Sequence, residues 1–145
     1  MMQALIDELR KPQYQGMSHA AAAAAINSLR VTVRRPVPTW AVRQAAIEGG
    51  FWAPLVLARE SQVPAVRSLA ISVLSWIDDP SGTIQTVDFD RPATVSMRAS
   101  LVAAGIVTQA QADSLAALAN VTIPWTESVG LPEIGIGLVI NARRV

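Results

Sequence analysis

Residues 63–79 read VPAVRSLAISVLSWIDD, and this stretch decides the fold. Its apolar side chains recur three and four positions apart, which is the spacing of one face of an α-helix. That face contains Val66, Leu69, Ala70, Val73, Trp76 and Ile77, while Arg67, Ser68, Ser72, Ser75 and Asp79 lie opposite. Pro64 suits the first turn of such a helix, where its missing N–H breaks no helical hydrogen bond. The sequence therefore predicts a central core helix at 64–79.

Two further helices are predicted after a turn at DPSG, residues 79–82. The first covers 92–104, and we expect Asp90 to act as its N-cap. Pro92 fits its first turn, and Gly105 marks its end.

The second of these helices is predicted at 109–119. Thr108 and Gln111 have the spacing of a capping box, in which each side chain accepts a hydrogen bond from the other residue's backbone N–H. We expect this helix to form a hairpin with the helix at 92–104, and the hairpin to pack against the central helix.

The N-terminal half contains shorter predicted helices. MSHAAAAAAINS, residues 17–28, has six consecutive alanines, and alanine is the strongest helix former. Ser18 can cap a helix at 18–28. Other helices are expected at 2–10, at 39–48 after a Thr39 cap, from Pro54 onward, and after Pro132 in the tail, where Gly135 and Gly137 weaken it.

An extended arm is predicted at 29–39. Val31 and Val33 alternate with polar residues, which is the period of a strand. Pro36 and Pro38 cannot donate backbone hydrogen bonds, so the arm cannot be a central strand. The expected fold class is therefore mainly α: a small single-domain helical bundle with this proline-bounded arm and the option of one short hairpin or strand pair.

The composition is that of one globular domain covering residues 1–145. Of the 145 residues, 51% are hydrophobic and 16% are charged, which is enough apolar surface to bury a core. A net charge of +1 provides no bulk attraction to nucleic acid or to anionic membranes. The lack of cysteine excludes disulfides, thiol nucleophiles and sulfur-ligated metals.

No targeting or membrane segment is predicted. The N-terminus, MMQALIDELRK, carries acidic residues where a secretion signal needs positive charge. The longest strongly apolar run, 69–77, is far shorter than the roughly 20 residues of a membrane-spanning helix. We therefore expect synthesis in the cytoplasm and no membrane span.

Residue types that are typical of catalysis or metal binding are sparse. His19 is the only histidine, and we expect a surface or capping role for it because no nearby group would orient it. Asp88 and Asp90 would share a face of an extended chain, but we expect Asp88 to be solvated and Asp90 to cap a helix. The G-I-G at 135–137 lacks the third glycine of a dinucleotide-binding fingerprint. We predict a non-enzyme with no catalytic residue, cofactor, metal or small-molecule substrate.

The predicted hairpin at 92–119 has the outline of a helix-turn-helix. Its second helix, QAQADSLAALA, contains no Lys or Arg and one Asp. A DNA-reading helix normally brings positive charge to phosphates and base edges. We therefore prefer a structural hairpin with no specific nucleic-acid partner, and a small DNA-binding regulator remains the less favoured alternative.

Four residues are candidates for contacts with another chain. Arg34 and Arg35 lie in the arm, and guanidinium groups pair well with carboxylates at interfaces. Trp52 and Trp125 are large aromatic residues in irregular stretches, as is common in anchoring side chains. The alternative is that these side chains cover the core of this chain itself.

Both ends of the chain resemble a group of small proteins encoded by tailed bacteriophages. Residues 4–27, ALIDELRKPQYQGMSHAAAAAAIN, are similar to an opening with an L-x-x-E-L helix, a proline, a Y-x-G-M-[ST] turn and an Ala-rich helix. Residues 128–145, SVGLPEIGIGLVINARRV, are similar to an ending with a G-L-P turn and a helix that finishes in A-R-R. The middle of the chain has no such likeness.

The resemblance implies a virion-associated structural protein of the tail or head–tail region, made in the host bacterial cytoplasm. Its expected partners are other virion proteins and copies of itself. An alternative from the same resemblance is a phage assembly factor or host-interaction module that is absent from the virion. The motifs include no catalytic residue.

Overall fold

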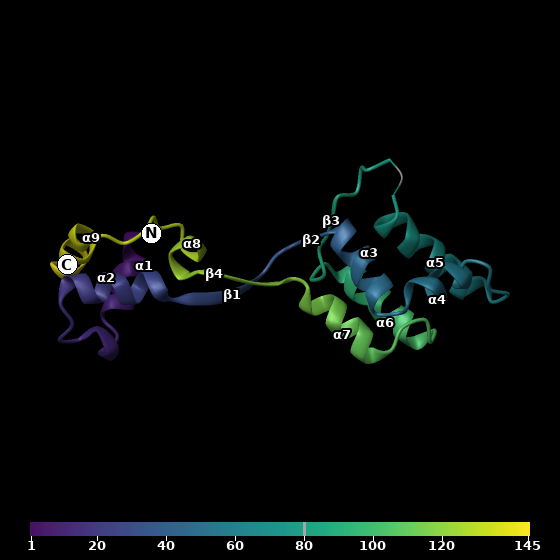
Figure 1. Cartoon of the computed structure of the whole chain (residues 1–145), viewed down its shortest axis with the longest axis horizontal. Helices are drawn as coiled ribbons and strands as arrows, with labels where there is room; N and C mark the ends of the chain where they lie inside the picture. Colours follow the sequence, from purple (N-terminus) through teal and green to yellow (C-terminus); the bar gives the residue numbers. More distant parts are fainter. Residues whose placement is uncertain (80) are drawn as a thin grey trace. The chain divides into compact units, whose positions relative to one another are not determined.

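The computed structural model describes residues 1–79 and 81–145. Its contacts divide the chain into two compact units, which are drawn in Figure 1. Unit 1 comprises Met1–Val33 and Val121–Val145, and unit 2 comprises Arg34–Asn120. In sequence terms, unit 2 is therefore an insertion between the two halves of unit 1.

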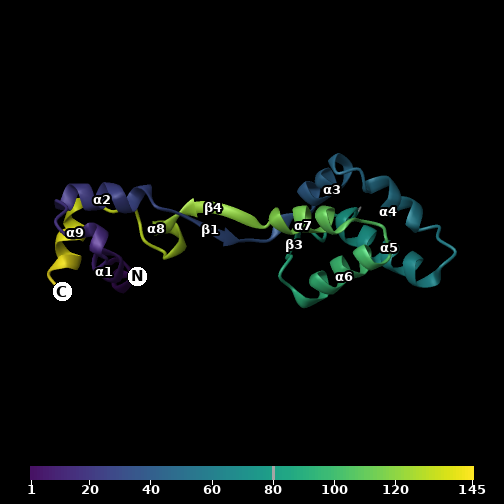
Figure 2. The ribbon, with the colours of Figure 1, turned by 90° about the horizontal axis from the view of Figure 1, so that it is seen from below.

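Unit 1 is built from both ends of the chain. Its elements are α1 (Met2–Leu9), the 3-10 helix η1 (Pro12–Tyr14), α2 (His19–Ser28), β1 (Arg30–Arg34), β4 (Asn120–Pro124), α8 (Trp125–Ser128) and α9 (Ile136–Arg143). The two strands pair with each other and run in opposite directions (Figure 2). One end residue of each strand belongs to unit 2.

The core of unit 1 lies where α1 and α2 contact α9. Ala22 is fully buried and Ala23 nearly so. Their small side chains allow α9 to approach closely, because the distance between packed helices depends on the side chains at the contact. The buried residues are Leu5, Ile6, Leu9, Tyr14, Ala22, Ala23, Ile26, Ile134, Val139 and Ala142.

The predicted helix at 18–28 is confirmed. The backbone N–H of Ala21 donates to Oγ of Ser18 at 3.1 Å, so Ser18 is the N-cap. The turn before it needs Gly16, whose φ of +81° lies in the left-handed region that residues with a Cβ rarely adopt. The helices predicted at 2–10 and after Pro132 are also present.

Unit 2 is a helical unit with a small two-stranded sheet. Its elements are β2 (Val37–Pro38), α3 (Thr39–Glu48), α4 (Trp52–Ala58), α5 (Pro64–Ile77), β3 (Thr86–Val87), α6 (Pro92–Ala103) and α7 (Gln109–Ala117). Strands β2 and β3 are antiparallel, with Val37 opposite Val87 and Pro38 opposite Thr86. The fold class is thus mainly α, as predicted.

The predicted core helix is confirmed as α5. Ala70, Val73 and Ile77 are buried in the core of unit 2, and Trp76 is half-buried against it. Leu74 is buried as well, although it was not expected on the inner stripe. The expected packing is also present, since α5 contacts α6 and α6 contacts α7.

The capping box of α7 forms as predicted. The N–H of Gln111 lies 3.1 Å from Oγ1 of Thr108, and the N–H of Thr108 lies 2.8 Å from Oε1 of Gln111. The amide of Gln111 also donates to the carbonyl oxygen of Gly49 at 2.9 Å. This bond attaches the start of α7 to the end of α3.

Two predicted caps are wrong. Arg91 occupies the N-cap position of α6 without a side-chain hydrogen bond, and the Asp90 carboxylate pairs with Arg34 instead. Pro38 precedes α3, and the hydroxyl of Thr39 lies 3.4 Å from the carbonyl oxygen of Gln85 rather than at an α3 amide. In both places a partner distant in sequence replaces the expected local one.

The arm predicted at 29–39 is extended, but it is paired within its own chain. Its first half is β1, which pairs with β4, and its second half contains β2, which pairs with β3. The local pattern gave no partner for these strands, and the strand at 120–124 was not predicted. The turn predicted at 79–82 includes Pro80, which lies outside the described residues.

The expectation of one bundle around one core is corrected by the two units. Helices α3, α4 and α6 contact α5, so they cover the central helix within unit 2. The two chain ends supply a second set of buried residues that forms its own cluster. The chain length is sufficient for one domain, but it does not determine how apolar residues are shared between cores.

Because residue 35 and residue 119 are hydrogen-bonded neighbours, unit 2 should be removable. The N–H of Arg35 lies 2.9 Å from the carbonyl oxygen of Ala119. We expect a variant in which Asn-Gly replaces residues 35–119 to fold, because that dipeptide forms the tight turn that joins two antiparallel strands. Circular dichroism should show a cooperative helical melt. A molten, non-cooperative product would contradict the independence of unit 1.

Candidate protein-binding surface

Helix α3 has apolar side chains on both sides. Val42 and Ala46 point into the core of unit 2, and both are buried. Trp40 and Ile47 lie seven residues apart, which places them on one face, and they are 62% and 57% exposed. A tryptophan that exposes this much surface is the clearest apolar feature of unit 2.

A groove of about 560 Å³ lies beside Trp40. Arg43, Ile84 and Gln85 also line it. Asp79 shapes this groove from the loop side, because its Oδ2 accepts the N–H of Ile84 at 3.0 Å. That hydrogen bond, with others from Ser81, lowers the pKa of Asp79. The carboxylate is charged at neutral pH and accepts hydrogen bonds from Ser81 and Ile84.

A second groove, of about 380 Å³, lies between α4 and α5. Trp52 and Val56 line it from α4, and Ile71 and Leu74 line it from α5. Ile71 is 49% exposed, whereas Leu74 is a buried member of the unit 2 core. The groove therefore offers the exposed apolar surface of Ile71 to a partner.

An ion pair joins the two grooves. Nη1 of Arg43, which lines the first groove, lies 3.1 Å from Oδ1 of Asp78, which lines the second. We define the tryptophan surface as Trp40, Arg43, Trp52, Ile71 and Asp78. It combines two aromatic side chains, an apolar side chain and a neutralised charge pair, which is a composition typical of protein interfaces.

Of the predicted interface residues, Trp52 belongs to the tryptophan surface, but Arg34 is held within unit 2. Nε of Arg34 lies 2.8 Å from Oδ1 and 2.9 Å from Oδ2 of Asp90. Its other nitrogens donate to Oδ1 of Asn120 at 2.8 Å and to the carbonyl oxygen of Ala116 at 3.2 Å. Arg34 therefore fastens α7 and the segment before α6 to the arm. Its loss should therefore affect folding.

The other two candidates lie apart from this surface. Arg35 is exposed and donates its backbone N–H to Ala119. Trp125 is the first residue of α8, and its side chain packs against the core of unit 1. The alternative stated for the four candidates, that they cover the chain's own core, fits Trp125, and it fits Trp52 in part, because Trp52 also packs against the core of unit 2. A contact of Arg35 with another chain stays a prediction.

Two motif residues of the chain's N-terminus form a buried pair in unit 1. The hydroxyl of Tyr14 donates to Oε1 of Glu8 at 2.9 Å, and both residues are buried. The ammonium of Lys11 binds the other carboxylate oxygen. Burial raises the pKa of Tyr14, and the hydrogen bond to Glu8 raises it further.

The two chain ends are hydrogen-bonded to each other. Asn27 donates from Nδ2 to the carbonyl oxygen of Ile134 at 2.9 Å and accepts the N–H of Ile134 at 2.8 Å. The Arg143 guanidinium donates to the carbonyl oxygens of Tyr14 and Met17 at 3.0 and 2.9 Å. The motif residues at the two ends therefore hold unit 1 together.

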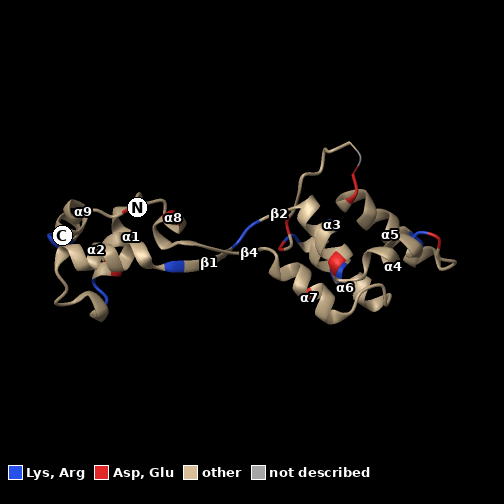
Figure 3. Cartoon of the chain, in the orientation of Figure 1, with Lys and Arg blue, Asp and Glu red and all other residues tan. Residues whose placement is uncertain are grey.

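The residues considered for catalysis or metal binding have structural surroundings. His19 starts α2, with its Nδ1 3.0 Å from Nη1 of Arg143. Asp88 accepts the backbone N–H of Asp90 at 3.0 Å. Within residues 1–79 and 81–145, no group of three potential ligands could hold a metal ion. Charged residues are dispersed over both units (Figure 3).

In the same described residues, every helix is too short or too polar to span a bilayer. The chain matches no protein-family model, no curated protein and no solved structure.

Trp40 was missed at the sequence level, although its signal was present. It lies two residues before Val42, so a helix at 39–48 places the two side chains on nearly opposite faces. A core-facing Val42 therefore implies an outward Trp40. Arg43 and Asp78 could not be paired from sequence, because their contact depends on how α3 and α5 pack.

Removing the Tyr14 hydroxyl should destabilise the fold. We expect Tyr14→Phe to lower the free energy of unfolding by roughly 1.5–3 kcal/mol, the usual contribution of a hydrogen bond to a charged group. Urea unfolding at pH 7 would measure it. Glu8→Gln is the matched control, because it keeps an acceptor oxygen and should cost less than Glu8→Ala. Equal stability of Tyr14→Phe and the native chain would contradict the buried pair.

The same tyrosine should make the fold sensitive to alkali. Because its pKa is raised in the folded state, the unfolded chain loses the proton first, and stability should fall as pH rises through about 10. We expect a smaller fall in Tyr14→Phe over that range. Parallel urea titrations at several pH values would show the difference, and identical slopes for the two proteins would refute this role.

Arg34 should contribute to folding. We expect Arg34→Met to lower the melting temperature, and Asp90→Asn to do the same, with the double variant losing less than the sum. Added salt should shrink the effect, because both side chains are partly exposed. Differential scanning calorimetry would test this. An unchanged melting temperature would contradict a folding role for Arg34 and would favour a contact with another chain.

Proposed function

We propose that this chain is a non-enzymatic structural subunit of a tailed-bacteriophage particle, in the tail or head–tail region. It binds other particle proteins, and copies of itself, through the tryptophan surface of unit 2. The resemblance of both chain ends to phage-encoded proteins supports the setting. The single observation that supports the mode of action is the 62% exposure of Trp40 beside a groove.

An exposed tryptophan side chain keeps a large apolar area in contact with water, and binding to a partner can bury that area. Burying a large aromatic side chain in a partner's pocket stabilises a complex more than most other contacts. Trp40 and Ile71 each stand beside a groove, so a partner can both receive these side chains and fill the hollows next to them. The Arg43–Asp78 pair between the grooves adds polar contacts that fix orientation more than affinity.

The two units contain different features of the proposed function. Unit 1 includes both stretches that resemble phage proteins, and the tryptophan surface lies in unit 2. We infer that unit 2 makes the contacts that are particular to this chain. The protein is made in the host cytoplasm and enters the particle during assembly.

Complementation would test the proposal directly. The gene for this chain would be deleted from the phage that encodes it. The mutant phage would then be grown on cells that supply the native protein or a variant. Quantitative mass spectrometry of purified particles would count the copies per particle. We expect the native chain to be present in every preparation. A chain that supports particle formation but is absent from the particles would overturn the structural role and indicate an assembly factor.

The surface is tested by Trp40→Ser in the same assay. We expect incorporation to fall by about thirtyfold at limiting expression, because a hot-spot tryptophan contributes on the order of 2 kcal/mol to binding. Unfolding should change by about 0.5 kcal/mol or less, since the residue is largely exposed. Ile136→Ser, at a 51% exposed position in unit 1, is the matched control. Equal incorporation of the two variants would contradict binding through this surface.

A further inference from the structure

The register of β1 against β4 shows which backbone groups their sheet uses. The N–H of Trp125 lies 3.0 Å from the carbonyl oxygen of Leu29, and the N–H of Arg35 lies 2.9 Å from the carbonyl oxygen of Ala119. Both bonds fit one regular antiparallel ladder, in which the odd-numbered residues of β1 direct their backbone groups at β4.

The even-numbered residues of β1 form an open edge. In such a ladder they direct their N–H and C=O groups away from β4. In unit 1 these residues are Arg30 and Thr32, and both are exposed. Within the part of the chain that the structure describes, the sheet contains only β1 and β4 (Figure 2). The backbone of Arg30 and Thr32 can therefore form hydrogen bonds to a further strand.

The outer edge of β4 is less suited to an added strand. The same register places Asn120, Thr122 and Pro124 on that edge. Pro124 has no N–H to donate. The register also places Asn120 opposite Arg34, and these two side chains are hydrogen-bonded at 2.8 Å, as an opposite pair can be. An added strand therefore belongs on β1.

The two faces of β1 differ in chemistry. Val31 and Val33 point to one face, are half-buried and belong to neither core cluster. Arg30 and Thr32 point to the other face and are exposed. A strand added at the open edge would place alternate side chains beside the two valines, and the others beside Arg30 and Thr32.

Arg30 determines which charge the added strand needs. Its Nη1 donates to the carbonyl oxygens of Asn27 and Leu29 at 2.9 and 3.1 Å. No carboxylate of the described residues lies within ion-pair distance of it. An acidic residue opposite Arg30 would balance this charge, because opposite charges on neighbouring strands stabilise a sheet.

A second copy of the chain fits this edge less well. Full antiparallel pairing of β1 with its copy would place Arg30 opposite Arg34 of the second copy. Arg34 already has its carboxylate partner, Asp90, within its own chain. No acidic group would then balance Arg30, and like charges directly opposite each other destabilise a sheet.

We propose that the β1 edge, defined as Arg30–Val33, binds an extended acidic segment of another protein by strand addition. The segment runs antiparallel to β1, with an acidic residue opposite Arg30, a small polar residue opposite Thr32 and β-branched apolar residues opposite the two valines. This surface depends neither on the tryptophan surface nor on a role in a phage particle.

Amide hydrogen exchange in the full-length chain tests whether the edge is open. We expect the amide of Thr32 to exchange at least tenfold faster than the amides of Val31 and Val33, because only those two are bonded to β4. Equal exchange at all three positions would overturn the proposal.

The binding probe is the peptide acetyl-Thr-Val-Thr-Val-Glu-amide, whose glutamate lies opposite Arg30 in the antiparallel register. Titration into the ¹⁵N-labelled chain should give saturable shifts of the Arg30 and Thr32 amide resonances, with a Kd in the millimolar range for so short a segment. The same peptide with lysine in place of glutamate should bind about fivefold more weakly. No saturable shift, or equal affinity for the two peptides, would overturn the proposal.

Methylated peptides test the register. N-methylation of the middle threonine removes a donor that is directed at β1 and should abolish binding. N-methylation of the second valine, whose N–H points away from β1, is the matched control and should change the Kd by about threefold or less. Equal binding of the two methylated peptides would rule out the proposed strand addition.

Variants of the chain provide an independent test. Thr32→Pro removes a donor from the β1 edge and keeps the ladder to β4, so it should abolish binding. Thr122→Pro, opposite it on the outer edge of β4, is the matched control and should bind like the native chain. Equal binding of both variants would refute the site. Should either fail to fold, Arg30→Glu decides, since it should prefer the lysine peptide, and an unchanged preference would overturn the proposal.

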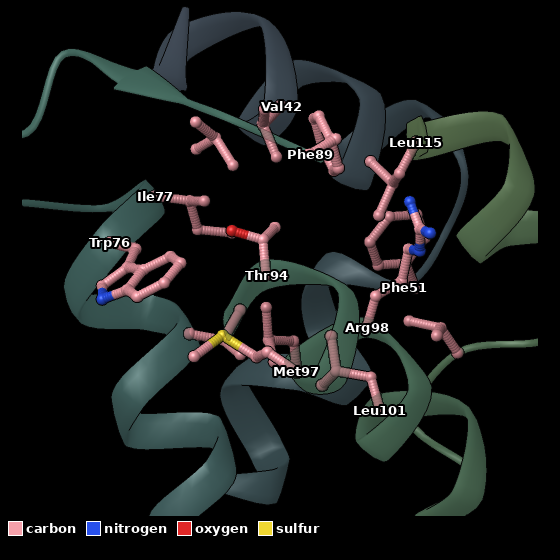
Figure 4. A pocket seen from close by; sticks show the side chains of 14 residues that line it. Val42, Phe51, Trp76, Ile77, Phe89, Thr94, Met97, Arg98, Leu101 and Leu115 are labelled. Atoms are coloured by element: carbon pink, nitrogen blue, oxygen red, sulfur yellow. The ribbon is translucent and has the colours of Figure 1, made fainter. Parts of the chain in front are cut away.

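Two other occupants have distinct readouts. Unit 2 has an apolar cavity of about 50 Å³ that Met97 lines (Figure 4), and a valine-rich peptide could enter it instead. With ¹³C-methyl methionine labelling, we expect a constant Met97 resonance, and a shift there without shifts at Arg30 and Thr32 would overturn the proposal. Self-association that Thr32→Pro abolishes, measured by sedimentation equilibrium, would assign the edge to a second copy and would also overturn it.

Discussion

The pairing of β1 with β4 is the constraint on which the rest of the structure depends. It is where the chain leaves unit 1 and where it returns, because the N–H of Arg35 meets the carbonyl oxygen of Ala119 at the edge of unit 2. The two halves of unit 1 are short, and neither buries a core alone. Their pairing brings α9 against α1 and α2 and allows Asn27 to bond both backbone groups of Ile134.

The residues of the two terminal motifs have physical roles in unit 1. Glu8 and Tyr14 of the first motif bond to each other in the core, and Gly16 supplies the positive φ that turns the chain into α2. Arg143, from the closing A-R-R, reaches back to the turn that contains Tyr14 and Met17. The two stretches on which the proposed resemblance rests therefore belong to one unit, and they contain no residue of unit 2. This agrees with the proposal that unit 2 makes the contacts specific to this chain.

Local features were predictable from the sequence, and contacts between distant segments were not. The stripe of α5, the Ser18 cap and the capping box at Thr108 all depend on residues within a few positions of each other. The partners of Asp90 and of the arm depend on which strands come together, and no periodicity encodes that choice. Trp40 alone could have been found, from its position opposite Val42.

The order of the two units along the chain has a consequence for how the protein is made. Unit 2 is continuous in sequence, so it can fold as soon as it has left the ribosome. Unit 1 must wait until α9 (Ile136–Arg143) has been synthesised, because that helix supplies part of its core. Once unit 2 is folded, its ends at Arg34 and Asn120 are already adjacent. The two halves of unit 1 can then pair without the entropy cost of closing a flexible loop between them. For about 87 residues, this saving is roughly 4 kcal/mol. The insertion that separates the two halves of unit 1 in sequence would thus act as the clamp that brings them together during synthesis.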